Sequence, residues 1–316
     1  MIAIVLAGGI GKRLRDVSQR ISKAMLPILG VPITARIIEQ ILAETPIRRL
    51  VVLVNKPEQD ISLFLKENPP RGADMQFVLQ PEPLGMAHAL RRVAGEVRLD
   101  SDFLLTACDN LFEPGTVADL YGTHCEQCLD GTMCLLRMEK ERLAGKSAAV
   151  YLDSGRVARI VEKPPLEEIE TDLASIPLYI FGARLIEYLP QVRLSKRGEY
   201  ELQDAIQMLL DDGGKIGYTV TGSRRTVTSP EDLLAINLEL LRKREGDTSL
   251  TIPGVEIEQP VMIEAGCSFS EGSRIGPNVY VGAGCTVGRN CRLSNCVLLP
   301  GTVVPDGTQA DSQLLR

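Results

Sequence analysis

The residues with the clearest capacity for chemistry lie near the start of the chain, where glycines and cations follow an apolar run. The run Ile2–Leu6 predicts a buried strand. Three glycines stand within four residues after it, and they are Gly8, Gly9 and Gly11. Glycine lets backbone N–H groups approach phosphate oxygens closely, and the cations Arg13 and Lys23 add positive charge. This order of strand, glycine loop, arginine and lysine predicts a site for a nucleoside triphosphate.

The glycine loop differs from two better-known phosphate-binding loops. A P-loop requires serine or threonine after its Gly-Lys pair, whereas Arg13 follows Gly11 and Lys12 here. A dinucleotide-binding fingerprint requires a third glycine at the position that Leu14 occupies. The remaining alternative is a tight turn after the first strand, with no ligand.

Two segments, Leu6–Leu14 and Lys23–Ile28, resemble the signature of the sugar-1-phosphate nucleotidylyltransferases, also called nucleotide-sugar pyrophosphorylases. The family pattern is roughly Leu-Ala-Gly-Gly-x-Gly-x-Arg-Leu followed by Lys-Pro-Met-Leu-Pro-Ile, and Ala24 replaces its first proline here. The resemblance implies an enzyme that uses Mg²⁺ to transfer a nucleotidyl group from an NTP to a sugar 1-phosphate, with release of pyrophosphate. It implies catalytic roles for Arg13 and Lys23. The nucleotide contacts that it implies in this loop are Leu6, Ala7, Gly8, Gly9 and Gly11.

A second loop, Gln80–Ala89, combines the end of a predicted strand with a glycine and a helix start. Glutamine offers both a donor and an acceptor, which suits the edge of a pyrimidine. Uridylyl and thymidylyl members of the family carry a similar Gln-Pro-x-x-x-Gly-x-Ala. By that resemblance Gln80, Gly85 and Met86 contact the base, and UTP or dTTP is the preferred NTP. His88 is expected to pack, or to support the residues that contact the ligand, rather than to catalyse. An ordinary loop is the alternative interpretation of the whole segment.

Two further motifs follow predicted strands. Asp109 comes just after the apolar run Phe103–Ala107, and a carboxylate beside a triphosphate is suited to Mg²⁺. The family has Gly-Asp-Asn or Asp-Asp at this point, which makes Asp109 the expected metal ligand and a catalytic residue. Glu162 and Lys163 match the sugar-phosphate element of the family. Glutamate can hold sugar hydroxyls, and Lys163 is expected to neutralise a phosphate as a catalytic residue.

Three positions depart from the family pattern. Pro177 and Ala148 stand where the family usually has glycine. Thr226 stands where a second metal-binding aspartate is usual, and a threonine hydroxyl is a poor Mg²⁺ ligand. These departures favour an alternative function, in which the chain is a non-catalytic regulatory subunit of a nucleotidyltransferase-like complex.

Composition places the chain among soluble globular proteins. It has 316 residues, 44% of them hydrophobic and 24% charged, which is enough for two domains. The net charge of −6 argues against nucleic-acid binding, and no apolar run reaches the length of a membrane span. The chain opens in a predicted strand, so no signal peptide is expected. The eight cysteines do not form a zinc-site pattern, and we expect a reduced, cytoplasmic protein.

Strand-like and helix-like segments alternate up to about residue 225. Apolar runs predict strands at Leu50–Val54, Met75–Leu79 and Phe103–Ala107, and helical patterns occupy Ala35–Ala43 and Pro83–Ala94. This alternation predicts an α/β fold with a Rossmann-like, mostly parallel sheet. Ligands bind such sheets at the carboxyl ends of the strands, where the glycine loop and Asp109 would both lie.

A helix and a linker end the predicted first domain. Ser229, Pro230 and Asp232 form a helix start with a capping box, and Gly246 ends the apolar pattern. The predicted domains are a nucleotidyltransferase domain over 1–246 and a repeat domain over 250–316.

The C-terminal part repeats every six residues. Apolar residues recur at Ile257, Ile263, Phe269, Ile275, Val281, Val287, Leu293 and Leu299. Small or β-branched residues follow four positions later and include Cys267, Cys285, Cys291, Val297 and Val303. The three cysteines are expected to be small core fillers rather than ligands. Gly266, Gly272, Asn278, Gly284 and Asn290 suit left-handed turns. The pattern resembles a short left-handed parallel β-helix of a little under three coils.

Such a short repeat has two open ends, so it is expected to assemble the chain into a homo-oligomer. An acyltransferase in the repeat is a third alternative. Enzymes of that kind generally use a histidine base, whereas His88 and His124 both lie outside the repeat.

Overall fold

The computed structural model describes residues 1–9, 14, 21–57, 59–244 and 250–316. The chain forms two compact units. The first combines Met1–Ile10 with Thr34–Arg225, and the second combines Gly11–Ile33 with Thr226–Arg316. These units do not coincide with the predicted boundary at residue 246, because the helix that precedes it packs on the repeat. The division into two domains at that residue stays a prediction.

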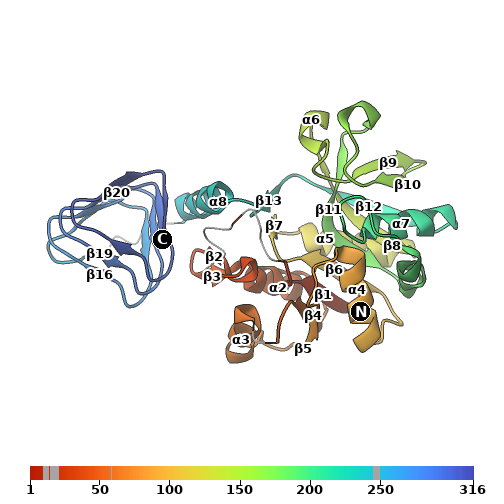
Figure 1. Ribbon diagram of the computed structural model, residues 1–316, viewed down its shortest axis with the longest axis horizontal. Helices are drawn as coiled ribbons and strands as arrows, with labels where there is room; N and C mark the ends of the chain where they lie inside the picture. Colours follow the sequence, from red (N-terminus) through yellow and green to blue (C-terminus); the bar gives the residue numbers. More distant parts are fainter. Residues whose placement is uncertain (10–13, 15–20, 58, 245–249) are drawn as a thin grey trace. The chain divides into compact units, whose positions relative to one another are not determined.

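A nine-stranded sheet forms the centre of the first unit (Figure 1), in the order β5-β4-β1-β6-β11-β8-β12-β10-β9. Its strands are β1 (Ile2–Leu6), β4 (Arg49–Val54), β5 (Asp74–Leu79), β6 (Phe103–Ala107), β8 (Gly131–Arg137), β9 (Ala149–Asp153), β10 (Arg156–Val161), β11 (Leu173–Phe181) and β12 (Ile216–Thr221). Strands β5, β4, β1 and β6 pair in parallel, as do β8 and β12. The α/β prediction is confirmed.

The expectation of a mostly parallel sheet is also confirmed, because among the nine described strands of this sheet β10 and β11 alone run opposite to the others. Strand β11 runs antiparallel to both β6 and β8, and β10 runs antiparallel to β12 and β9. Strands β9 and β10 form a hairpin because Ser154 and Gly155 both have positive φ, at 47° and 78°. A two-residue turn of this kind can join only antiparallel strands.

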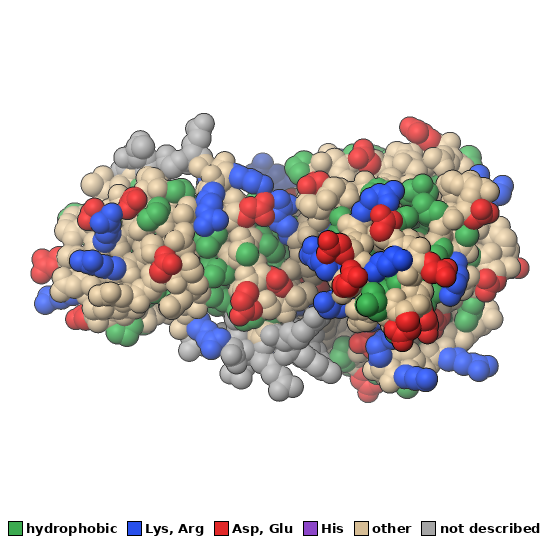
Figure 2. Space-filling model, turned by 90° about the horizontal axis from the view of Figure 1, so that it is seen from above, with side chains coloured by type: hydrophobic (Ala, Val, Ile, Leu, Met, Phe, Trp, Pro, Cys, Tyr) green, Lys and Arg blue, Asp and Glu red, His purple; other side chains and the backbone are tan. Residues whose placement is uncertain are grey.

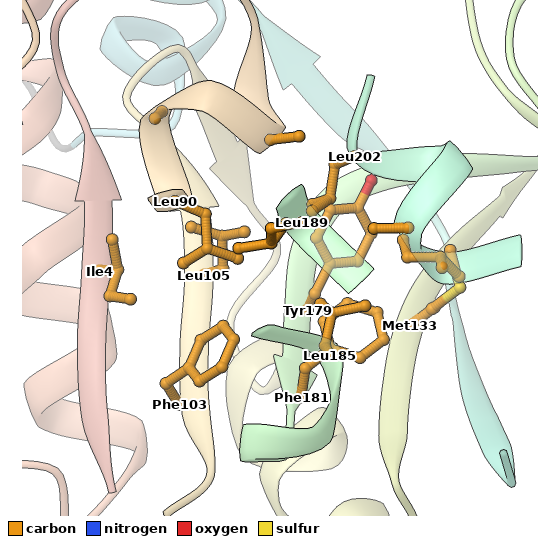
Figure 3. Packing of buried hydrophobic residues seen from close by; sticks show 14 of the residues in the cluster. Ile4, Leu90, Phe103, Leu105, Met133, Tyr179, Phe181, Leu185, Leu189 and Leu202 are labelled. Atoms are coloured by element: carbon orange, nitrogen blue, oxygen red, sulfur yellow. The ribbon is translucent and has the colours of Figure 1, made fainter. Parts of the chain in front are cut away.

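Helices cover the sheet of the first unit. They are α2 (Ile33–Glu44), α3 (Asp60–Glu67), α4 (Met86–Glu96), α5 (Thr116–Gln127), α6 (Lys140–Leu143) and α7 (Leu202–Asp211), with short 3-10 turns at η3 (Leu166–Glu168) and η4 (Ala183–Gln191). Figure 3 shows one side of the core, where Leu105 and Tyr179 from the sheet face Leu90 of α4, Leu189 of η4 and Leu202 of α7. Burial of these side chains fixes the helices that carry the loops described below.

Stacked coils form most of the second unit (Figure 1). The strands are β14 (Glu256–Ile257), β15 (Val261–Ile263), β16 (Ser268–Phe269), β17 (Arg274–Ile275), β18 (Val279–Val281), β19 (Thr286–Val287), β20 (Arg292–Ser294), β21 (Cys296–Leu298), β22 (Val303–Val304), β23 (Gln309–Asp311) and β24 (Leu314–Leu315). They pair in parallel in three sheets of four, four and three strands. The five predicted turn residues all have positive φ, between 54° and 80°. This arrangement is consistent with the predicted left-handed β-helix.

The six-residue count loses its register near residue 295. Earlier coils pair residues 18 apart, as Ser268 does with Thr286, whereas later coils pair residues 17 apart. As a result Val303, which continues the predicted series of small or β-branched residues, is 69% exposed, and Val304 is buried at 3%. The coils also continue to β24, beyond the predicted span of a little under three coils. One missing residue in a coil explains the shift, and a strict count cannot detect it.

Helix α8 (Pro230–Arg242) and the hairpin of β2 (Pro27–Ile28) and β3 (Val31–Pro32) belong to the second unit. The capping box is confirmed, since Ser229 Oγ accepts from the Asp232 N–H at 3.2 Å and Asp232 accepts from the Ser229 N–H at 3.0 Å. A second apolar cluster outside the coils joins the helix and the hairpin to the repeat. Its buried members are Leu29, Leu238, Leu241, Tyr280 and Val297.

Buried Asn237 of α8 holds the hairpin in place. Its Oδ1 accepts from the Leu29 N–H at 2.8 Å, and its Nδ2 donates to the carbonyl oxygens of Pro27 at 3.1 Å and Leu233 at 2.9 Å. The short 3-10 turn η2 (Lys23–Met25) directly precedes this hairpin. The repeat and α8 therefore support the segment that carries the signature lysine.

The state of the cysteines and the distribution of charged side chains can be compared with the expectations from composition. All eight cysteines are free, and Cys285 and Cys291 fill the inside of the coils as predicted. No helix in the described ranges is long and apolar enough to cross a membrane. On the face drawn in Figure 2, basic and acidic side chains are interspersed.

Candidate functional site

A cavity of about 320 Å³ lies in the first unit, at the carboxyl ends of the parallel strands. Predicted site residues that line it are Leu6, Gly8, Gly9, Gln80, Gly85, Met86, Glu162 and Lys163. These residues come from three separate motifs that the sequence analysis assigned to nucleotide and sugar phosphate. The fold brings them around one space.

The glycine loop is fixed by the neighbouring strand and by a buried glutamine. The Ala7 N–H donates to the Leu53 carbonyl oxygen at 2.8 Å, and Gln59 Nε2 donates to the Ala7 carbonyl oxygen at 3.0 Å. A Cβ at Gly8 would lie 3.3 Å from Leu53, whereas one at Gly9 meets no described atom within 4 Å. Ala7 is fully buried and supports the loop from below. Gln59 could not be predicted from the sequence, because no pattern marks a single buried amide between two loops.

Gly85 is required by both backbone angle and space. Its φ is +98°, and a Cβ there would lie 2.6 Å from the Tyr200 carbonyl oxygen. The loop is tied to Tyr200 by two backbone hydrogen bonds, from Tyr200 N–H to Leu84 at 2.7 Å and from Ala87 N–H to Tyr200 at 3.1 Å. The left-handed conformation of Gly85 delays the helix, so α4 begins at Met86 and not at Pro83 as predicted.

Gln80 lies at the end of β5 and is only 5% exposed. Its backbone N–H donates to the Val54 carbonyl oxygen at 2.8 Å, which extends the parallel ladder by one residue. Its side-chain Nε2 lies 2.9 Å from Nδ1 of His88 and 3.4 Å from the Gly85 carbonyl oxygen. The amide is therefore ordered at the cavity wall.

Glu162 and Lys163 follow β10 and form an ion pair with Nζ–Oε1 at 3.3 Å. Burial raises the pKa of Glu162, and the positive charge of Lys163 opposes this rise without cancelling it. Lys163 has φ of +45°, a rare angle for a residue with a side chain. An ammonium group and a carboxyl group that share one cavity wall can contact both a phosphate and hydroxyl groups.

The segment over residues 199–203, to which the sequence patterns above assign no ligand, also contributes to the cavity. Glu199, Glu201 and Gln203 all line it. Glu201 is held by Ser195 Oγ at 3.0 Å and by Arg197 Nη2 at 2.9 Å. Carboxylates and an amide add hydroxyl-binding groups to this wall.

Several predicted residues are not placed at the cavity. Gly11 and Arg13 lie outside the described residues, and Lys23 belongs to the second compact unit. Asp109 follows β6 but is not among the residues that line the cavity. Its Oδ1 accepts from Asn110 Nδ2 at 2.6 Å.

We tested whether the residues near Asp109 suit a metal ion. In the described part of the chain, no three His, Cys, Asp or Glu side chains gather as they do in an all-protein metal site. Burial lowers the pKa of Arg224, and the negative charge of Asp109 opposes this effect, so these two charges interact. Mg²⁺ is commonly held by one or two carboxylates plus substrate phosphates. Asp109 fits an ion that arrives with a nucleotide.

Two of the three departures from the family pattern are accommodated locally. Pro177 lies where the pairing of β11 with β8 shifts register between Ser175 and Tyr179, so its missing N–H interrupts no ladder there. Its carbonyl oxygen accepts from Thr106 Oγ1 at 2.9 Å. Ala148 is buried at 3%.

Comparison with known proteins agrees with this geometry. The family described as Nucleotidyl transferase matches residues 2–242, and the GMPPB C-terminal domain matches residues 257–314. A low-salt glycan biosynthesis nucleotidyltransferase, Agl11 of Haloferax volcanii, is 32% identical over 77% of this chain and 67% of its own length. A glucose-1-phosphate thymidylyltransferase of Streptomyces griseus is 29% identical over 99% of this chain and 85% of its own length.

Two further comparisons concern a longer relative and a solved structure with the same fold. The bifunctional protein GlmU of Methanococcus maripaludis is 28% identical over 88% of this chain, which spans 62% of that protein. A UDP-glucose pyrophosphorylase solved with UDP-glucose has a TM-score of 0.68 at 20% identity, over 77% of this chain and 99% of its own. The family match covers most of the chain and includes every described element that lines the cavity. The chain belongs to the nucleotidyl transferase family.

Proposed function

We propose that the protein transfers a nucleotidyl group from UTP or dTTP to a sugar 1-phosphate, forming a nucleotide sugar and pyrophosphate. The observation that carries this proposal is the single cavity lined by the glycine loop, the Gln80–Met86 loop and the Glu162-Lys163 pair. Relatives named as glucose-1-phosphate thymidylyltransferase and UTP–glucose-1-phosphate uridylyltransferase support the same reaction.

The proposed roles follow from charge and reach. An oxygen of the sugar phosphate attacks the α-phosphorus in line, and the bond to the β-phosphate oxygen breaks as pyrophosphate leaves. Such chemistry depends on positioning and on neutralising charge. Arg13 and the glycine loop would hold the pyrophosphate, and Lys23 and Lys163 would neutralise the α-phosphate and the sugar phosphate. Glu162 would accept hydrogen bonds from sugar hydroxyls.

Asp109 is the proposed protein ligand of Mg²⁺. Bound together with the nucleotide, the ion would reduce the negative charge that the attacking oxygen meets. Asp109 would hold the ion in position. Asn110 donates a hydrogen bond to Oδ1 of Asp109 and would keep the carboxylate in one rotamer.

A panel assay tests the reaction. The full chain is incubated with each of UTP, dTTP, CTP, ATP and GTP and with several sugar 1-phosphates, and pyrophosphate release is measured. We expect release above background with a pyrimidine nucleotide. A clear preference for ATP or GTP would contradict the assignment of the base. Complete inactivity would favour the regulatory alternative, and Thr226→Asp then offers a second test, since it restores the carboxylate usual in the family.

Assembly and location are further parts of the proposal. We infer a reduced, cytoplasmic setting because all eight thiols are free. The repeat is proposed to join copies of the chain through its open coil ends. Light scattering of the full chain tests this, and a monomer at all concentrations would exclude it.

A further inference from the structure

The side-chain amide of Gln80 is held in one orientation by two acceptors. Nε2 lies 2.9 Å from Nδ1 of His88 and 3.4 Å from the carbonyl oxygen of Gly85. A backbone carbonyl can only accept, and this one also accepts the Ala89 N–H of α4 at 3.1 Å. Turning the amide by half a rotation would place Oε1 against that oxygen and against a ring nitrogen. The NH₂ group is therefore the side that faces the helix.

This arrangement requires His88 to offer a lone pair at Nδ1. A proton at Nδ1 would face the NH₂ group of Gln80, donor against donor, so the neutral ring carries its proton on Nε2. The surroundings favour the neutral ring, because burial lowers the pKa of His88 and the cations of Arg91 and Arg92 lower it further. Glu82 acts in the opposite direction and does not reverse the shift. The ring also stacks on Tyr200, with centroids 6.2 Å apart.

The other amide atom is left for a ligand. In the described part of the chain, both hydrogen bonds of the Gln80 side chain use Nε2. Oε1 is not enclosed either, since Thr219 Oγ1 is the one buried side-chain polar atom without a partner among the described residues. Gln80 lines the cavity, and Oε1 is the side-chain acceptor that its contacts with Gly85 and His88 leave unused.

We propose that His88 is a positioning residue for base selection, which fixes Gln80 so that Oε1 accepts a hydrogen bond from the N3–H group of uracil or thymine. The inference rests on the proposed function, because that function places the base of the nucleotide next to Gln80. Cytosine has a lone pair at N3 and would face Oε1 acceptor against acceptor. A site built around one N–H group rejects a base that lacks it, since the acceptor is left unpaired.

Two substitutions at one position separate the hydrogen bond from the packing. His88→Ala removes the acceptor, which frees the Gln80 amide to rotate. His88→Asn places an amide oxygen near the position of Nδ1, so the acceptor is kept while the ring is lost. Circular dichroism and urea unfolding check that both variants are folded.

Calorimetry of the full chain with UTP and with CTP, each with Mg²⁺, measures the selection. We expect His88→Ala to reduce the ratio of the CTP Kd to the UTP Kd by about 10- to 100-fold. This change corresponds to the free-energy penalty of leaving one buried acceptor unpaired. His88→Asn should retain most of the ratio. An unchanged ratio in His88→Ala, or an equal loss in both variants, would overturn the proposal.

A second measurement needs no nucleotide. The chain has only two histidines, so ¹⁵N spectra of the imidazoles resolve His88, and we expect the form protonated at Nε2 alone. Gln80→Glu should raise the pKa of His88, because a carboxylate beside Nδ1 favours the charged ring. A proton on Nδ1, or no response to Gln80→Glu, would refute the contact itself. Failure of pyrophosphate release with these spectral results intact would refute only the proposed function.

Discussion

The two compact units use buried and partly buried polar side chains for different purposes. In the first unit, Gln80, Glu162 and Lys163 stand at strand ends with atoms that face a cavity. In the second, Ser273 Oγ donates to the Gly288 carbonyl oxygen at 2.8 Å, and Asn237 makes all three of its hydrogen bonds to backbone. Polar groups of the first kind remain available to a ligand, whereas those of the second kind hold their own chain. The cavity wall of the first unit is therefore expected to take part in the chemistry, whereas these polar groups of α8 and the coils are expected to support the chain.

The largest expected effect is a loss of turnover when a charged residue of the cavity wall is removed. Lys163→Ala should slow pyrophosphate release by about 10²–10³-fold, because one preorganised charge is lost from the transition state. Stability in urea should change little, since its ion pair with Glu162 lies at the cavity wall. Lys243→Ala is the matched control, because this lysine of α8 pairs with Glu239 at 2.7 Å on an exposed helix face. Equal turnover in the two variants would remove the distinction between the units.

Asn237→Ala examines the supporting unit. Removing its three hydrogen bonds leaves buried backbone groups of Pro27 and Leu29 without partners, so we expect a loss of about 3 kcal/mol in the free energy of unfolding. Hydrogen exchange should also become faster at the Leu29 amide. Asn68→Ala serves as a control, because its side chain makes one exposed hydrogen bond. Slow exchange at Leu29 in the variant would show that Asn237 does not secure the hairpin.

Gly85→Ala tests the backbone that shapes the cavity. A Cβ in a left-handed conformation, close to the Tyr200 backbone, should cost about 1–3 kcal/mol and weaken nucleotide binding. Gly95→Ala lies inside α4, where a Cβ would meet no described atom within 4 Å, and should instead stabilise the protein by up to about 1 kcal/mol. Urea unfolding and calorimetry measure both. Similar behaviour of the two variants would mean that the loop relaxes without loss.

The smallest effect concerns pH. Burial raises the pKa of Glu162, so above its ordinary value near 4.5 the folded state keeps a proton that the unfolded state has lost. Stability contributed by this site therefore falls as pH rises through the window between the ordinary and the raised pKa. Glu162→Gln should flatten the profile of urea midpoints across that window. A variant profile parallel to that of the parent protein would contradict the assignment.

Local patterns predicted much of the fold. The run Phe103–Ala107 coincides with β6, and the capping box of Ser229 and Asp232 is formed as expected. These features depend on neighbours a few residues apart, so the sequence displays them directly. The shortened coil after Leu293 was not predictable from a strict six-residue count, because one missing residue changes which side chains face inward.

The motifs of the site could be predicted from the sequence, whereas the hydrogen bonds between its residues could not. Gln80, Gly85 and Lys163 could be found because their spacing resembles a family pattern. Gln59 holds Ala7, which is 52 positions away in the sequence. His88 contacts the side-chain amide of Gln80 and acts through the orientation of that amide. The spacing of residues in one sequence shows neither contact. The antiparallel direction of β11 likewise depends on how a long connection returns to the sheet.

The tie between Leu29 and Asn237 also bears on how the chain is made. These residues are 208 positions apart, so the hairpin leaves the ribosome long before its partner helix has been synthesised. Contacts of such separation carry a large loop-closure entropy and form late in folding. The strands β1, β4, β5 and β6 can pair beforehand, since all of them precede α8 in the chain. The segment around Lys23 is thus translated long before α8 and is among the last to reach its native partners.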